Sequence, residues 1–184
     1  KNKQLITIYG ISLLFASAYY TAYSYIEPFL AQVANLSNNS ITLVLSLFGV
    51  AGIGGSYLFS KFYNLNRKRF ILISLFCLTI VLFILKPSTA SIITLLLICV
   101  VWGMSSTAFN VACQSETILV TNEQTSSIAM SIFSGIFNLG IGLGSFIGGQ
   151  TINILNIQSI GYIAGIIGIL SVIFYIRRRK SMLK

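Results

Sequence analysis

Residues 131–149 read SIFSGIFNLGIGLGSFIGG and combine apolar side chains with six glycines. It is apolar enough to lie in lipid, although each interior glycine costs a soluble helix roughly 1 kcal/mol relative to alanine. In a membrane, small residues instead allow two helix backbones to approach closely. Gly140, Gly144 and Gly148 are spaced four apart, so they share one face of a helix. The stretch therefore predicts a transmembrane helix that packs against another helix along this glycine face.

The composition of the whole chain agrees with a membrane protein. Of its 184 residues, 55% are hydrophobic and only 8% are charged, whereas a soluble domain carries about 25% charged residues. The chain has no histidine and no aspartate, which removes the commonest general base and most metal ligands. We therefore expect no metal site, no cofactor and no enzymatic activity.

Six segments meet or nearly meet the length of about 20 mostly apolar residues that a bilayer-spanning helix needs. They cover residues 5–30, 41–60, 70–85, 91–113, 127–149 and 159–176. The connections between them are short and polar, so consecutive helices must run antiparallel. The sequence thus predicts an all-α polytopic membrane protein, in which residues 1–184 form a single six-helix domain.

The basic residues indicate how this domain is oriented in the membrane. All lysines and arginines except Lys86 fall on one side of the predicted zigzag, and cytoplasmic loops are the ones enriched in Lys and Arg. We therefore expect both termini, together with the second and fourth connections, in the cytoplasm. The net charge of +9 comes from residues at the ends of apolar runs, which favours membrane lipid, not nucleic acid, as a partner.

The first span ends in YSYIEPFL, residues 23–30, and contains Glu27. The other two acids, Glu116 and Glu123, fall in the predicted fourth connection, a cytoplasmic loop. Because ionising a carboxylate in hydrocarbon is costly, an acid within a span indicates function by default. Glu27 is either a substrate or proton site, or it faces interfacial water where Pro28 bends the end of the helix.

Two tyrosines share a helix face with Glu27. Tyr20 and Tyr23 precede it by seven and four residues. Phenol rings with their hydroxyls suit sugars or amphipathic solutes in a central cavity. The alternative is an interfacial aromatic belt, and the sequence leaves both interpretations open.

Polar side chains also occur inside the fourth and fifth spans. Asn110 and Gln114 are four apart on one helix face, with Trp102 two turns earlier, and Asn138 lies within the glycine-rich stretch. Amides in lipid must find partners, so they turn inward. They either bond to a neighbouring helix or form the wall of a cavity.

Glycines in two further spans predict close helix packing. Gly52 in the second span is followed by serines at four-residue spacing, and Gly161 and Gly165 in the sixth span are four apart. Such small-residue spacing is typical of packed transmembrane helices. We expect both faces to be packing seams.

Several of these stretches together resemble one family. They are TAYSYIEPFL (21–30), LFGVAGIGGS (47–56), VWGM (101–104) with Gln114, AMSIFSGIFNLGIGLGSFIGGQ (129–150) and SIGYIAG (159–165). With them, in this order, the chain resembles helices seven to twelve, the C-terminal half, of a major facilitator superfamily transporter of the drug:H+ antiporter branch. More narrowly, it is similar to the bacterial sugar efflux transporters.

The resemblance implies a secondary transporter in the bacterial inner membrane. Such a protein would export sugars or sugar-like molecules by proton antiport, with alternating access around a midplane site. Its partners would be protons, the substrate, and either an absent N-terminal half or a second copy. A multidrug efflux pump of the same branch and a non-transporting truncated fragment are the alternatives. KFYNLNRKR (61–69) occupies the place of a family loop motif and keeps its basic end but lacks its aspartate, so the resemblance does not extend a gating ion pair to this loop.

Overall fold

The computed structural model describes residues 2–178. Six of its helical segments, with α1 and α2 counted together, are long and apolar enough to cross a membrane, so the chain is an all-α polytopic protein. The helices are α1 (Lys3–Tyr23), α2 (Ile26–Gln32), α3 (Asn38–Phe62), α4 (Arg67–Ser88), α5 (Ile92–Leu119), α6 (Glu123–Ile154) and α7 (Ile160–Arg178), with the short 3₁₀ turns η1 (Tyr63–Leu65) and η2 (Ile157–Ser159).

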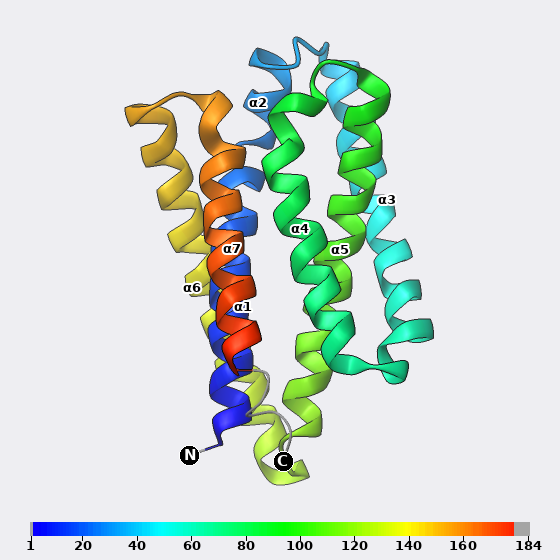
Figure 1. Ribbon diagram of the computed structural model, residues 1–184, viewed down its shortest axis with the longest axis vertical. Helices are drawn as coiled ribbons and strands as arrows, with labels where there is room; N and C mark the ends of the chain where they lie inside the picture. Colours follow the sequence, from blue (N-terminus) through cyan, green and yellow to red (C-terminus); the bar gives the residue numbers. More distant parts are fainter. Residues whose placement is uncertain (1, 179–184) are drawn as a thin grey trace.

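The helices form two groups of three that lie side by side (Figure 1). In one group α1 packs against α6 and α7, and in the other α5 packs against α3 and α4. Contacts of α4 with α7 and of α1 with α5 join the groups. In the most apolar window of each span, 61% of residues are buried in α1–α2, but only 28% in α3 and 17% in α6. Helices α3 and α6 therefore leave wide faces without a protein partner.

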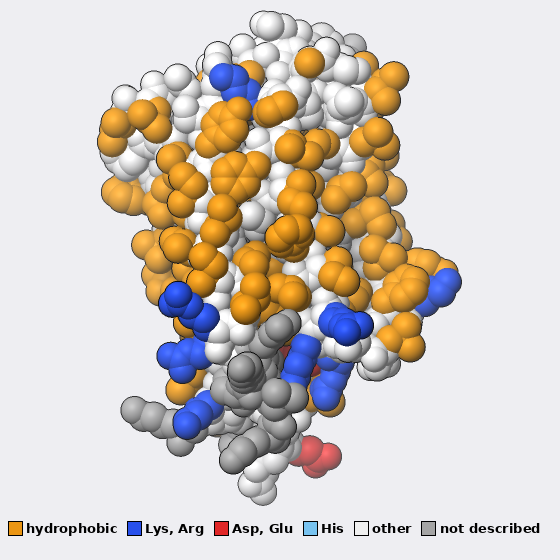
Figure 2. Space-filling model, viewed as in Figure 1, with side chains coloured by type: hydrophobic (Ala, Val, Ile, Leu, Met, Phe, Trp, Pro, Cys, Tyr) orange, Lys and Arg blue, Asp and Glu red, His pale blue; other side chains and the backbone are white. Residues whose placement is uncertain are grey.

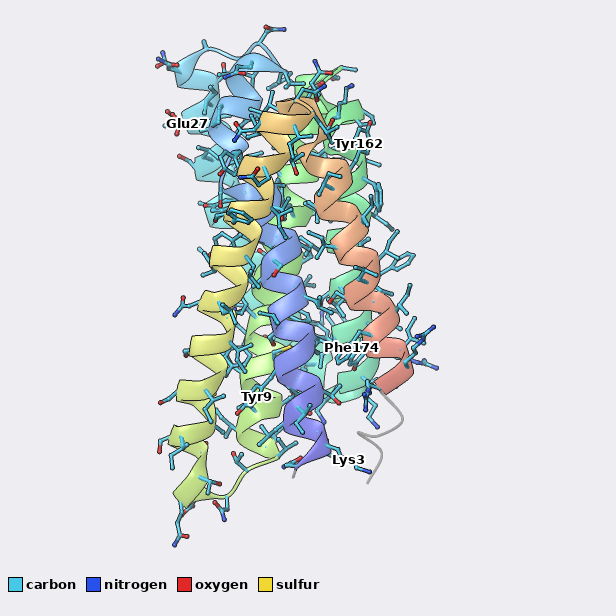
Figure 3. The ribbon with its side chains drawn as sticks, turned by 90° about the vertical axis from the view of Figure 1, so that its left-hand side faces the viewer. Lys3, Tyr9, Glu27, Tyr162 and Phe174 are labelled. Carbon is cyan, nitrogen blue, oxygen red and sulfur yellow. The ribbon has the colours of Figure 1, made fainter. Side chains whose placement is uncertain are left out.

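The charges divide the molecule into two ends. Lys3 and Phe174 lie toward one end, and Glu27 and Tyr162 lie toward the other (Figure 3). Figure 2 shows an apolar band with lysines and arginines gathered beneath it and one basic group above it. Such a band between polar ends is what a bilayer-embedded protein presents.

Helices α4 and α6 begin before the apolar runs that were predicted as spans. The Asn66 side chain accepts a hydrogen bond from the Arg69 amide at 3.0 Å, and Asn122 does the same for Thr125 at 3.0 Å. Such caps satisfy amides that have no partner within the helix, so polar residues at these ends are helical too.

The predicted segment 5–30 implied one continuous helix. In the structure this first span consists of two helices. It is interrupted at Ser24 and Tyr25, between α1 and α2. Pro28 lies in the first turn of α2, and its ring is incompatible with a helical carbonyl four residues earlier, at Ser24. The Tyr25 hydroxyl donates to the Ser145 carbonyl on α6 at 2.9 Å. The proline and this contact together fix the interruption.

The glycine face of α6 lies directly on α1. A methyl group placed at Gly144 would lie 2.5 Å from the Ser17 carbonyl oxygen, and one at Gly140 would lie 2.7 Å from the Ala16 side chain. Gly148 similarly faces the Thr21 backbone. No other residue type would allow the two backbones to approach this closely.

The other predicted glycine seams also meet neighbouring helices. A methyl group at Gly161 would lie 2.6 Å from the Leu82 carbonyl oxygen of α4, and one at Gly165 would lie 2.7 Å from the Phe83 ring. At Gly52 it would lie 2.9 Å from the Thr107 hydroxyl of α5.

We expect Gly144→Ala to lower the thermal unfolding midpoint of the purified chain in detergent. The added methyl group must push α1 and α6 apart, and overpacking of this kind costs typically about 1–3 kcal/mol. Gly142→Ala is the matched control, because a methyl group there meets nothing within 4 Å. Equal midpoints for the two variants would contradict the packing of α6 on α1.

Candidate functional site

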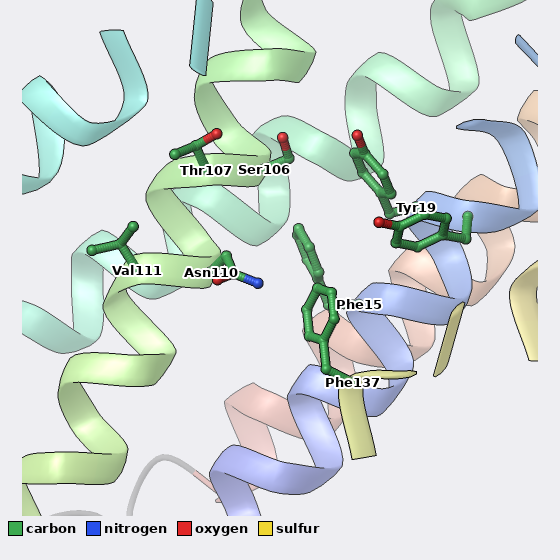
Figure 4. Close-up of a pocket in the computed structure, with 8 residues that line it drawn as sticks. Phe15, Tyr19, Ser106, Thr107, Asn110, Val111 and Phe137 are labelled. Atoms are coloured by element: carbon green, nitrogen blue, oxygen red, sulfur yellow. The ribbon is translucent and has the colours of Figure 1, made fainter. Parts of the chain in front are cut away.

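A cavity of about 230 Å³ opens between α1, α5 and α6 (Figure 4). Its walls differ in chemistry: α1 and α6 contribute mainly aromatic rings, whereas α5 contributes hydroxyls and an amide. The lining residues are Phe15, Tyr19, Tyr20, Ser106, Thr107, Asn110, Val111 and Phe137. An aromatic face opposite polar groups can bind a solute that has both apolar and hydrogen-bonding surfaces.

The aromatic wall is held in place by stacked rings behind it. Phe15 stacks on Phe109 with ring centroids 3.9 Å apart. Tyr19 packs edge-on against Tyr20 at 4.8 Å and against Trp102 at 5.8 Å. Trp102 itself is fully buried. Trp102 therefore supports the cavity wall from behind. A residue in contact with substrate would instead line the cavity, which Trp102 does not.

The polar wall centres on Asn110. The Gln114 side-chain amide donates a hydrogen bond to Asn110 Oδ1, so the oxygen of Asn110 is occupied. The Asn110 amide nitrogen is directed toward the cavity (Figure 4). The sequence left two interpretations of this pair open, a hydrogen bond to a neighbouring helix or a position in the wall of a cavity. In the structure Gln114 bonds to Asn110 within α5 and orients it, and Asn110 lines the cavity.

The remaining candidates are not among the residues that line this cavity. Tyr23 packs on Phe48 with ring centroids 5.3 Å apart, and Asn138 is exposed on α6. Glu27 is exposed on α2, where it lines a separate pocket with Asn38 and residues of α3. The structure thus brings Tyr20 together with Asn110 and Gln114, and it separates these three from Glu27, Asn138 and the buried Trp102.

Several lining residues were not predicted from the sequence. Ser106 and Thr107 precede Asn110 by four and three residues, so helical spacing placed them on the same face. Phe137 is adjacent to Asn138 but faces the cavity. The signal for the serine and threonine was present in the sequence, whereas the direction of Phe137 depends on how α6 packs.

The expectation that Glu116 lies in a cytoplasmic loop is wrong. It belongs to α5 and is only 7% exposed. The Tyr63 hydroxyl donates to Glu116 Oε1 at 2.8 Å, and Arg67 Nη1 lies 3.6 Å from the same oxygen. Because these partners stabilise the carboxylate, α5 continues past the apolar run. The connection between α3 and α4 has no acidic residue, and its Tyr63 and the adjoining Arg67 contact this acid of α5 instead.

We expect Tyr63→Phe to destabilise the chain, because it removes a hydrogen bond to a buried carboxylate. Hydrogen bonds to charged groups contribute about 1.5–3 kcal/mol, so the thermal midpoint in detergent should fall. Tyr57→Phe is the control, since Tyr57 is 61% exposed on α3. Equal midpoints in both variants would mean that the Tyr63–Glu116 bond contributes nothing measurable.

Six candidate spans and a partly polar cavity between three of them define the class of the chain, a polytopic membrane protein with a recess between its helices. The sequence of residues 8–184 matches the family model described as Major Facilitator Superfamily, and the chain belongs to this family.

Known relatives carry a more specific name. The chain is 37% identical over 176 residues to a "Probable sugar efflux transporter" of Mannheimia succiniciproducens. The matched region covers 96% of this chain and 44% of that protein. Proteins of the same name from Pasteurella multocida and Helicobacter pylori strain HPAG1 are 33% and 34% identical, again over 96% of this chain and over 43% and 45% of their own lengths. The chain therefore spans less than half the length of these relatives.

Proposed function

We propose that this chain is the C-terminal half, helices seven to twelve, of a transporter that exports sugars or sugar-like molecules by proton antiport. The observation that carries the proposal is the one-sided cavity. Its volume of about 230 Å³ is below the roughly 300–1,000 Å³ of typical ligand pockets, and its three helices leave one side open. A second six-helix unit would supply the other wall, as in two-half transporters with a midplane site.

The faces beside the cavity support a second unit. Helices α3 and α6 are the least buried spans, and Gly49, Gly135 and Gly142 have open space where a side chain would be. Asn138, exposed on α6, lies on this unpartnered surface. In lipid, a polar side chain such as that of Asn138 needs a protein partner. This partner would be the N-terminal half or, alternatively, a second copy of the chain.

A sugar-like substrate fits the chemistry of the cavity. Asn110, Tyr20 and the hydroxyls of α5 would bond to substrate hydroxyls, and the rings of Phe15 and Phe137 would cover its apolar face. Export and sugar specificity rest on the names of the relatives, whose function we extend to this chain here.

Proton coupling requires a titratable group, and the chain offers few. Glu116 is engaged by Tyr63 and Arg67, and Glu123 lies at the first turn of α6. Glu27, exposed on α2 and lining a pocket, is the proposed proton site of this half. The basic end of the molecule, with Lys61 and Arg67, would face the cytoplasm by the positive-inside rule.

A substrate panel tests the proposed function. Cells that produce this chain with its complementary half should export labelled sugars and should not gain resistance to hydrophobic cations. Resistance without sugar export would favour the alternative, a multidrug pump. If both halves are present in the membrane and the cells show neither sugar export nor resistance, this result would favour a non-transporting fragment.

A further inference from the structure

A further recess lies outside the proposed transport site and outside the pocket lined by Glu27, between α3 and α4. Both helices pack on α5 but make few contacts with each other, which leaves an apolar crevice of about 240 Å³. The main lining residues are Leu58 on α3, Phe70, Ile73 and Cys77 on α4, and Val101 and Met104 on α5. Exposed neighbours such as Ile80 continue the apolar surface along α4.

The α4 residues that line the crevice extend over much of one leaflet of a bilayer. From Phe70 to Cys77, α4 rises by about 10 Å, which is most of the roughly 15 Å of hydrocarbon in one leaflet. The crevice starts at the basic end of the molecule, because Phe70 lies in the first turns of α4. An acyl chain of the leaflet at that end would lie along it.

Helical spacing relates two basic residues, Lys61 and Arg69, to the end of the crevice where a lipid headgroup would lie. Lys61 follows the lining residue Leu58 by three positions, and Arg69 precedes Ile73 by four, so each shares a helix face with a lining residue. Both side chains are exposed, and within residues 2–178 neither has an acid within ion-pair distance. The nearby acid, Glu116, is paired with Arg67.

We propose that this crevice binds an anionic phospholipid. Lys61 and Arg69 hold its phosphate, and one acyl chain fills the apolar recess between α3 and α4. An anionic lipid is favoured over a zwitterionic one because the cations at the mouth outnumber the acids, so a headgroup amine finds no free carboxylate there. Clusters of Lys and Arg at the end of a span favour anionic headgroups in the same way.

Cys77 provides a direct readout of occupancy. It is half-buried in the crevice, whereas Cys99 and Cys113 are buried. The purified protein is placed in nanodiscs of phosphatidylcholine, with or without phosphatidylglycerol, and alkylated with a membrane-soluble maleimide. Phosphatidylglycerol should slow the alkylation of Cys77. The variant Lys61→Gln/Arg69→Gln should need at least about tenfold more phosphatidylglycerol for the same protection.

The matched control is Lys3→Gln/Arg177→Gln, which removes two positive charges at the same end of the molecule but away from the crevice. It should keep the protection of the unaltered protein. The proposal is overturned if phosphatidylcholine alone protects Cys77 as well as phosphatidylglycerol does. It is also overturned if the control pair loses protection as much as Lys61→Gln/Arg69→Gln does, because the attraction would then be general. Native mass spectrometry of the released lipid provides a second measurement, with phosphatidylglycerol expected as the retained species.

Discussion

Replacing Asn110 by leucine is expected to lower sugar efflux about 5- to 150-fold in the transporter assembled from this chain and its complementary half. Leucine has a similar size but no amide, so a substrate hydroxyl at the α5 wall would stay unpaired in a closed site. Leaving a buried polar group without its hydrogen bond costs about 1–3 kcal/mol, and 1.4 kcal/mol corresponds to a factor of ten. The measurement is the initial rate of labelled sugar efflux from cells or liposomes.

Two further variants separate direct contact from positioning. Gln114→Leu should have a smaller effect than Asn110→Leu, since Gln114 acts by bonding to Asn110. Asn39→Leu, the same substitution at an exposed residue of α3, should leave efflux unchanged. Full efflux by Asn110→Leu would remove the cavity from the proposed substrate path.

Glu27→Gln is expected to abolish sugar export against a concentration gradient when a pH gradient drives it. Glutamine keeps the size of glutamate and can still form hydrogen bonds, but its amide neither binds nor releases a proton at physiological pH. Sugar exchange down its own gradient should continue, because Glu27 lies apart from the cavity lined by Tyr20 and Asn110. Comparing driven export with passive exchange in liposomes separates coupling from substrate binding.

The control for this prediction is Glu123→Gln, which removes an exposed carboxylate at the first turn of α6. It should leave driven export unchanged. Driven export that persists in Glu27→Gln would assign the coupling group to the other half of the transporter.

The general architecture followed from the sequence for physical reasons. The apolar runs had to be buried in lipid or protein, and their length fixed them as bilayer-spanning helices. The spacing of Gly140, Gly144 and Gly148 indicated a helix face able to approach another backbone, and α1 is the helix that it meets. The sequence did not indicate which helix this would be, because the partner depends on the three-dimensional arrangement of all six spans.

The site could be predicted only in part. Asn110 and Tyr20 were recognisable because polar side chains in a span must turn away from lipid. Trp102 was named with them because it lies two turns before Asn110, yet it packs behind Tyr19, since an aromatic residue can be placed either at a cavity surface or within a core. Helical spacing alone does not distinguish these positions.

Two features depended on contacts between distant parts of the chain. Glu116 was assigned to a loop because its charge ended an apolar run, and only its contacts with Tyr63 and Arg67 make a helical, buried position favourable. The interruption at Ser24 was expected only as a bend at Pro28. Its position also depends on Tyr25, which bonds to α6.

The most direct test of the proposed half-transporter is sugar transport by purified protein in liposomes, measured with and without the complementary six-helix half. The proposal predicts no transport by this chain alone, because its cavity lacks one wall, and proton-driven sugar transport when both halves are reconstituted together. Transport by this chain alone as a stable monomer would contradict it.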